Sequence, residues 1–139
     1  MPETTPAPGH PLSPAAEPVD AGFAGLGLQA PLQQAAAQAG WVTPTAVQRA
    51  VLPAVLQGRD VLAQAPTGAG KTAAFLLPIL QRVLSVPDVA QARPRRLVAL
   101  VLSPTRELAA QTGAAAQALA PQLKTVVAVG GLSINPQMM

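Results

Sequence analysis

Residues 65–72 constrain the fold more than any other part of this 139-residue sequence. They read Ala-Pro-Thr-Gly-Ala-Gly-Lys-Thr and stand between a short apolar run, residues 61–63, and a stretch with helical apolar spacing that begins near Gly70. An apolar run closed by a glycine-containing turn is typical of a buried strand. We therefore predict a strand, a tight loop and a helix in direct succession.

This loop fits the phosphate-binding pattern G-x-x-x-x-G-K-[ST] at its last three positions, with Ala65 in place of the first glycine. Gly68 and Gly70 would let backbone N–H groups approach a phosphate, and Lys71 would meet the β- and γ-phosphates at the helix start. The Thr72 hydroxyl would help to hold Mg²⁺, and we predict Lys71 and Thr72 as catalytic residues. The alternative is a simple strand–helix turn with an exposed lysine. The predicted nucleotide-binding residues of the loop are Ala65, Pro66, Thr67, Gly68, Ala69, Gly70, Lys71 and Thr72.

The order of the other elements predicts an α/β fold. We expect helices over residues 31–39, from Thr43-Pro44 to just before Gly58, over 70–84 with a kink at Pro78, and over 105–119. Apolar runs at 61–63, 97–102 and 125–129 predict strands of a parallel sheet covered on both faces. Residues 1–20 contain six prolines and are expected to form a disordered tail, with the folded part at 21–139.

Composition excludes several kinds of site. The chain has no cysteine, and its one histidine, His10, lies in the proline-rich tail, so thiolate and histidine chemistry is not expected. No apolar run approaches the length of a membrane span, and the N-terminus does not resemble a secretory signal. We therefore expect a cytoplasmic protein.

The charge is distributed unevenly along the chain. Residues 1–20 hold three acids and no base, whereas the rest has nine bases against three acids, 9 − 3 = +6. Such an excess suits a polyanionic partner, although it is a weak signal alone. The basic cluster Arg93, Arg95 and Arg96 is more simply interpreted as a solvated loop than as a nucleic-acid contact, because no aromatic residues interleave with it.

Four segments in the right order resemble DEAD-box RNA helicases. Residues 65–72 are similar to motif I of that family, in which alanine is the usual first residue, and residues 40–48 resemble its Q motif, with Phe23 in the place of the isolated aromatic upstream. Pro104-Thr105-Arg106-Glu107-Leu108-Ala109 is similar to motif Ia, and Gly130-Gly131 to the GG element. The resemblance covers about residues 23–131 and implies a RecA-like domain. The ending Ile134-Asn135-Pro136-Gln137 looks most like the bacterial RhlE-type branch.

The resemblance implies roles for residues outside the loop. Gln48 would read adenine through its amide, Phe23 would stack on the base, and Thr45 would belong to the same ATP site. For Gln48 the alternative is an exposed helix glutamine, and for Phe23 it is a core anchor beneath the first helix. RNA phosphates would be bound at Pro104, Thr105, Arg106, Glu107, Gly130 and Gly131 without reading base sequence. The alternative for motif Ia is a solvent-exposed helix cap.

Absent motifs limit the activity that we expect. After residue 20 the acids are Asp60, Asp88 and Glu107, and none follows an apolar strand as the carboxylate pair of the family does. We expect the chain to be the front part of the first RecA-like domain of an ATP-dependent RNA helicase, inactive alone in ATP hydrolysis and unwinding.

Other classes of function stay open. One is a non-enzymatic module that binds adenine nucleotides, and another is a different phosphate-loop enzyme such as a kinase or GTPase. An interaction domain that uses the proline-rich tail as a ligand is less favoured, because the tail has no basic-flanked P-x-x-P anchor.

Overall fold

A computed structural model describes residues 22–87 and 97–131. The proline-rich tail, the Arg93–Arg96 cluster and the ending at 134–137 lie outside these residues. Within them the elements are, in order, a 3₁₀ helix η1 (Ala24–Leu26), α1 (Ala30–Gln38), α2 (Ala46–Leu56), α3 (Lys71–Leu84) and α4 (Arg106–Leu119).

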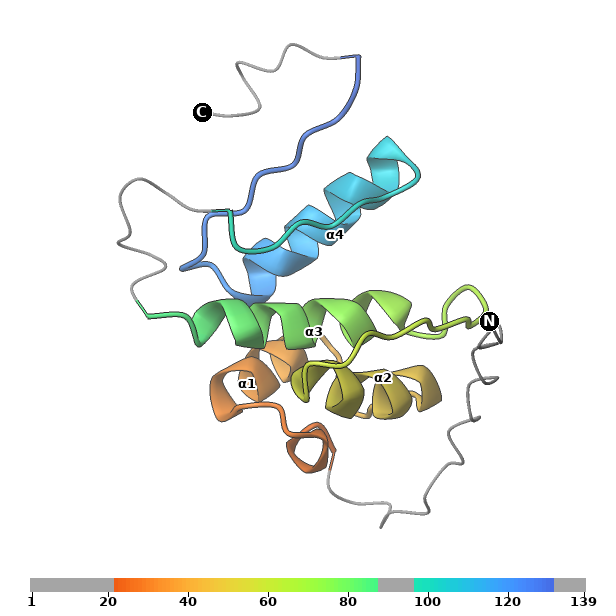
Figure 1. Cartoon of the computed structure of the whole chain (residues 1–139), viewed down its shortest axis with the longest axis vertical. Helices are drawn as coiled ribbons and strands as arrows, with labels where there is room; N and C mark the ends of the chain where they lie inside the picture. Colours follow the sequence, from red (N-terminus) through yellow and green to blue (C-terminus); the bar gives the residue numbers. More distant parts are fainter. Residues whose placement is uncertain (1–21, 88–96, 132–139) are drawn as a thin grey trace, which may run out of the picture.

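The helix α3 lies at the centre of the arrangement. Figure 1 shows it between α4 on one side and α1 and α2 on the other, and α3 contacts both α2 and α4. Its apolar side chains explain this position: Leu76, Leu77 and Leu80 are buried, and Leu77 is completely so. Burial of one such leucine stabilises a fold by about 2 kcal/mol. The strongly apolar α3 therefore holds the other helices together.

The helix boundaries follow the expected signals within one or two residues. Pro31 stands in the first turn of α1, and Gly40 follows it with a left-handed φ of +83°. The start of α2 is corrected, because Thr45 is its N-cap and Pro44 precedes the helix. The helix begins there because Thr45 and Gln48 form a capping box. The N-cap is therefore two residues later than the Thr43-Pro44 pair predicted.

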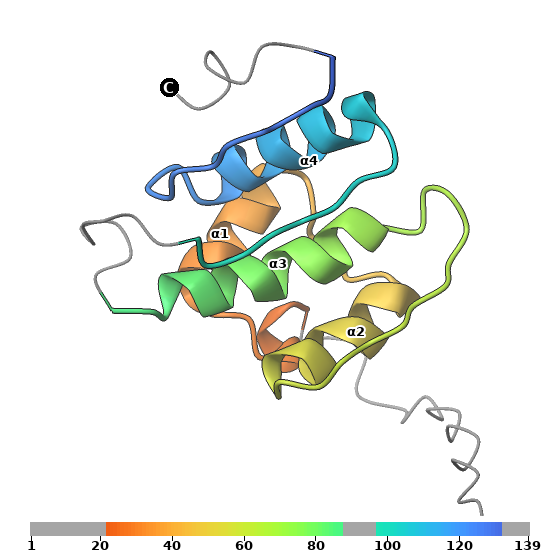
Figure 2. The same ribbon diagram turned by 45° about the horizontal axis from the view of Figure 1, so that its top comes forward.

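The predicted strands do not appear as hydrogen-bonded strands in the described part of the chain. In the segment 97–102 every residue is exposed, with Leu97 at 79% and Leu102 at 85%. Residues 123–130 do alternate between half-buried and exposed, as the two-residue period of a strand requires. Figure 2 shows this segment running beside α4. A strand needs a neighbouring strand to satisfy its N–H and C=O groups, and these segments pack against helices or are open to solvent.

Candidate functional site

The start of α3 carries the predicted phosphate loop. Gly70 is the N-cap of the helix, in the left-handed conformation with φ +84°, and Lys71 is the first helical residue. Gly68 also has a positive φ, +79°. Both conformations are costly for residues with a Cβ, which explains why the two positions are glycine.

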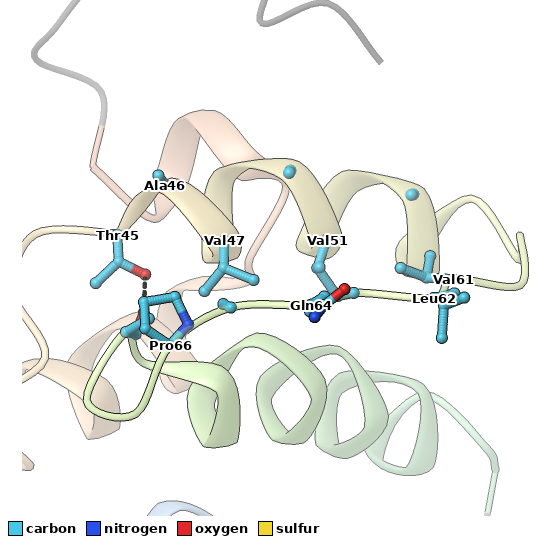
Figure 3. A pocket seen from close by; sticks show the side chains of 13 residues that line it. Thr45, Ala46, Val47, Val51, Val61, Leu62, Gln64 and Pro66 are labelled. Carbon is cyan, nitrogen blue, oxygen red and sulfur yellow. Dashed lines mark hydrogen bonds between the residues drawn. The ribbon is translucent and has the colours of Figure 1, made fainter. Parts of the chain in front are cut away.

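Thr45 and Gln48 of α2 reach across to this loop. The Thr45 hydroxyl donates to the Ala69 carbonyl at 2.8 Å, as the dashed line in Figure 3 marks, and the Gln48 Nε2 group donates to the Gly70 carbonyl at 3.0 Å. The Gln48 Oε1 atom accepts from the Thr45 backbone N–H at 2.9 Å. The structure thus brings together two elements that are 22 and 24 residues apart in the sequence. The spacing Thr-x-x-Gln is that of a capping box and could have indicated the helix start, although it could not have indicated the loop contact.

Gln48 is therefore a buried residue, which corrects the alternative of an exposed helix glutamine. Only 4% of it is exposed, because its amide fits between the helix start and the loop. The contact of Gln48 with adenine stays a prediction. The two hydrogen bonds described for the amide use its oxygen and one of its two N–H groups, so the second N–H group takes no part in them.

Lys71 is folded back onto its own loop. Its ammonium group donates to the carbonyls of Ala65 and Pro66, the latter at 2.9 Å. Carbonyl oxygens are weaker partners for an ammonium group than phosphate oxygens, since they carry no net charge. Lys71 is also exposed, and Thr72 is half-buried at the next position of α3.

A mostly apolar cavity of about 560 Å³ lies between α2 and the segment that leads into the loop. Figure 3 shows Val47 and Val51 of α2 facing Gln64 and Pro66 of that segment. Thr45, Ala65, Pro66 and Ala69 are the predicted nucleotide-binding residues among its lining, whereas Gln48 and Phe23 do not line it.

Phe23 belongs to the hydrophobic core. Only 5% of the residue is exposed, and it packs in the same cluster as Leu28 and Leu32. The core interpretation of Phe23 is confirmed, and stacking on adenine stays a prediction.

The predicted RNA-binding residues come together at the start of α4. Thr105 is the N-cap, and its hydroxyl accepts from the Leu108 N–H at 3.2 Å, so the capping interpretation of motif Ia is confirmed. Glu107 stands in the first turn, where a negative charge suits the helix dipole. The Arg106 Nε group donates to the Gly130 carbonyl at 3.0 Å and thereby joins motif Ia to the GG element. All six predicted residues are exposed: Pro104, Thr105, Arg106, Glu107, Gly130 and Gly131.

Two other findings concern metals and membranes. In residues 22–87 and 97–131 no three His, Cys, Asp or Glu side chains gather where they could hold a metal ion. Over the same residues no helix has the length and apolar character needed to cross a membrane.

Comparison with known proteins bears on the family and the fold. Residues 45–139 match the family described as DEAD/DEAH box helicase. The chain is 46% identical over 117 residues to the ATP-dependent rRNA helicase RRP3 of Pyricularia oryzae, covering 83% of this chain and 20% of that protein. It is 45% identical over 114 residues to the ATP-dependent RNA helicase DDX47 of Drosophila melanogaster, covering 81% of this chain and 21% of the relative.

The chain also resembles a solved structure, the RNA helicase Prp28 of Chaetomium thermophilum bound to ADP. The TM-score is 0.67 at 40% identity, and the match covers 82% of this chain and 28% of that one. This likeness confirms the predicted fold class, an incomplete α/β domain of the RecA-like kind. The chain spans about a fifth of the length of the two curated relatives.

Proposed function

Because the chain belongs to the DEAD/DEAH box helicase family, we propose that it binds ATP at the loop 65–72 and RNA at the start of α4. In the whole protein these two sites would couple ATP hydrolysis to local unwinding of RNA duplexes. The observation that carries the proposal is the contact of Thr45 and Gln48 with the carbonyls of Ala69 and Gly70, which joins the Q motif to the phosphate loop.

The residues of the loop fit a triphosphate. Gly68 has open space around the position of a Cβ, so its backbone is accessible to a phosphate oxygen. Lys71 would exchange its two carbonyl partners for β- and γ-phosphate oxygens, which are stronger acceptors because they are charged. The Thr72 hydroxyl would be a ligand of Mg²⁺, which, when bound, neutralises phosphate charge.

Gln48 would select adenine if the amide N–H that the loop and the helix cap leave over donates to N1, which accepts in adenine and carries a hydrogen in guanine. Its burial and two hydrogen bonds fix the orientation of the amide, and a fixed amide discriminates between bases better than a mobile one. Phe23 would support this region from the core.

The experiment that tests the ATP site compares two nucleotides. Titration of the wild-type chain and the Gln48→Ala variant with fluorescent ATP and GTP analogues in the presence of Mg²⁺ gives four dissociation constants. We expect the wild type to prefer ATP at least tenfold and the variant to lose that preference. If ATP and GTP weaken equally in the variant and the preference survives, Gln48 supports the loop without reading the base. If neither nucleotide binds the wild type, the ATP site itself is wrong.

The absence of hydrolysis by the 139-residue chain is part of the same proposal. In residues 22–87 and 97–131 the side chains that form hydrogen bonds with the loop are those of Thr45, Gln48 and Lys71, and none of them is a carboxylate that could orient a water molecule. We expect ATP binding without RNA-stimulated release of phosphate, and release above the rate of a Lys71→Ala control would contradict this.

A non-enzymatic nucleotide-binding module stays the second candidate, favoured by the same missing carboxylate. The relatives reported above are eukaryotic and do not support the bacterial RhlE-type branch, which stays a prediction resting on residues outside the described part. A cytoplasmic location also stays a prediction, which fractionation of expressing cells would test.

A further inference from the structure

The side chain of Arg106 links the first turn of α4 to the turn at Gly130-Gly131. Its Nε and Nη2 groups both donate to the Gly130 carbonyl, with the Nε distance at 3.0 Å. Two donors of one rigid guanidinium plane on a single acceptor set the direction of that carbonyl, and with it the peptide plane that carries the N–H of Gly131.

Gly131 is shaped to receive this guanidinium. Its φ is +79°, a conformation that favours glycine, and a Cβ at this position would stand 2.7 Å from Nη2 and 3.6 Å from Cζ of Arg106. The guanidinium therefore lies where a side chain at 131 would be, so any residue other than glycine would displace it.

A second contact sets the register of the two elements. Val127 packs directly on Gly113 of α4, where even a methyl group would overlap its Cγ2 atom. From Gly113 back to Arg106 is seven residues of helix, roughly 10.5 Å, and from Val127 on to Gly130 is three residues of extended chain, roughly 10 Å. The helix α4 and the segment around Val127 run in opposite directions, and these two lengths agree. Gly130 therefore lies beside Arg106, which binds its carbonyl.

We propose that Arg106 is a positioning residue for RNA: it fixes the Gly130-Gly131 turn beside the start of α4, so that both present backbone N–H groups to neighbouring phosphates. This inference rests on the proposed function, since RNA is the ligand. It differs from a direct contact, because the contribution of Arg106 comes through the geometry of the turn and only secondarily through its charge.

The first experiment needs no RNA and reads the turn directly. Backbone ¹⁵N relaxation of the 139-residue chain gives order parameters for Gly130 and Gly131 in the wild type, Arg106→Gln and Arg106→Lys. Arg49→Gln is the matched control, since it removes the same charge from an exposed position in α2. We expect values near 0.85 for the wild type and the control, and values below about 0.6 for both Arg106 variants. Unchanged order in Arg106→Gln would overturn the inference.

The second experiment measures affinity for a single-stranded oligouridylate at several salt concentrations. Gly131→Ala keeps every charge, so we expect a loss of affinity of at least fivefold with an unchanged slope of log K against log salt. A direct phosphate contact predicts instead that Arg106→Lys, which keeps the charge, binds about as the wild type does and that Arg106→Gln lowers the slope by about 0.7. That result would overturn the inference. Failure of the wild type to bind RNA would contradict the proposed function, and the relaxation experiment separates the two cases.

Discussion

The amide of Gln48 occupies the space that a side chain on Gly70 would need. A Cβ at Gly70 would overlap Gln48 Nε2 and would stand 3.1 Å from the Thr45 hydroxyl oxygen. Gly70 is thus glycine for two reasons, its φ of +84° and this close approach, and the second reason is a direct consequence of the capping box on α2.

The variant Gly70→Ala is expected to destabilise the chain by about 2–4 kcal/mol, from the left-handed backbone and from displacement of Gln48. Gly68→Ala is the matched control, because Gly68 has nearly the same φ, +79°, and open space around it. It should cost only about 1–2 kcal/mol. Chemical denaturation gives both free energies of unfolding. In a Gln48→Ala background the difference between the two substitutions should shrink to what the close approach of Thr45 leaves, and an unchanged difference would show that Gln48 is not the obstacle.

The variant Gly113→Ala is expected to destabilise the chain, against the general rule for helices. Alanine in a helix interior is about 1 kcal/mol more favourable than glycine, but here its methyl group would overlap the stiff Val127 side chain. In a Val127→Ala background the obstacle is gone, and Gly113→Ala should become stabilising by up to about 1 kcal/mol. Thermal unfolding of the four proteins measures the change of sign. A stabilising effect in the wild-type background would mean that the segment around Val127 does not pack on α4.

Gln81 is expected to hold the entry to α1 against α3. It is 9% exposed, its Oε1 accepts from the Gln29 N–H at 2.7 Å, and its Nε2 donates to the Gly27 carbonyl at 2.9 Å. Gln81→Leu leaves both backbone groups without this partner and should cost about 2–4 kcal/mol in the free energy of unfolding. Gln81→Glu keeps an acceptor for Gln29 and loses the donor for Gly27, so its loss at neutral pH should be comparable or larger. Full stability of Gln81→Leu in urea denaturation would contradict the role.

The exposed leucines are expected to make the 139-residue chain associate with itself. Leu62 is fully exposed, and Leu100 and Leu102 are 69% and 85% exposed in a segment with strand-like sequence. Replacing Leu100 and Leu102 by lysine should lower binding of a hydrophobic dye severalfold and shift the chain towards the monomer in analytical ultracentrifugation. Leu62→Lys serves as a separate variant for the other segment. A wild-type chain that is monomeric at high concentration would refute this expectation.

Local signals determined much of this protein. The proline at the start of α1, the glycines that close the turns and the loop sequence 65–72 place the helices and the phosphate loop, because caps, φ preferences and short-range hydrogen bonds depend on neighbours in the chain. The segments 40–48, 65–72, 104–109 and 130–131 sufficed to recognise the family that the comparisons confirm.

Only the tertiary structure decided what the site residues touch. The hydrogen bond of Gln48 to the Gly70 carbonyl and that of Arg106 to the Gly130 carbonyl join residues 22 and 24 positions apart, and no pattern in the intervening sequence encodes such a pairing. The tertiary structure also decided the strands, which the local sequence predicted and which do not form in the described part of the chain. Residues 97–102 have the composition of a strand and form none, because a strand exists only when another strand accepts and donates its hydrogen bonds.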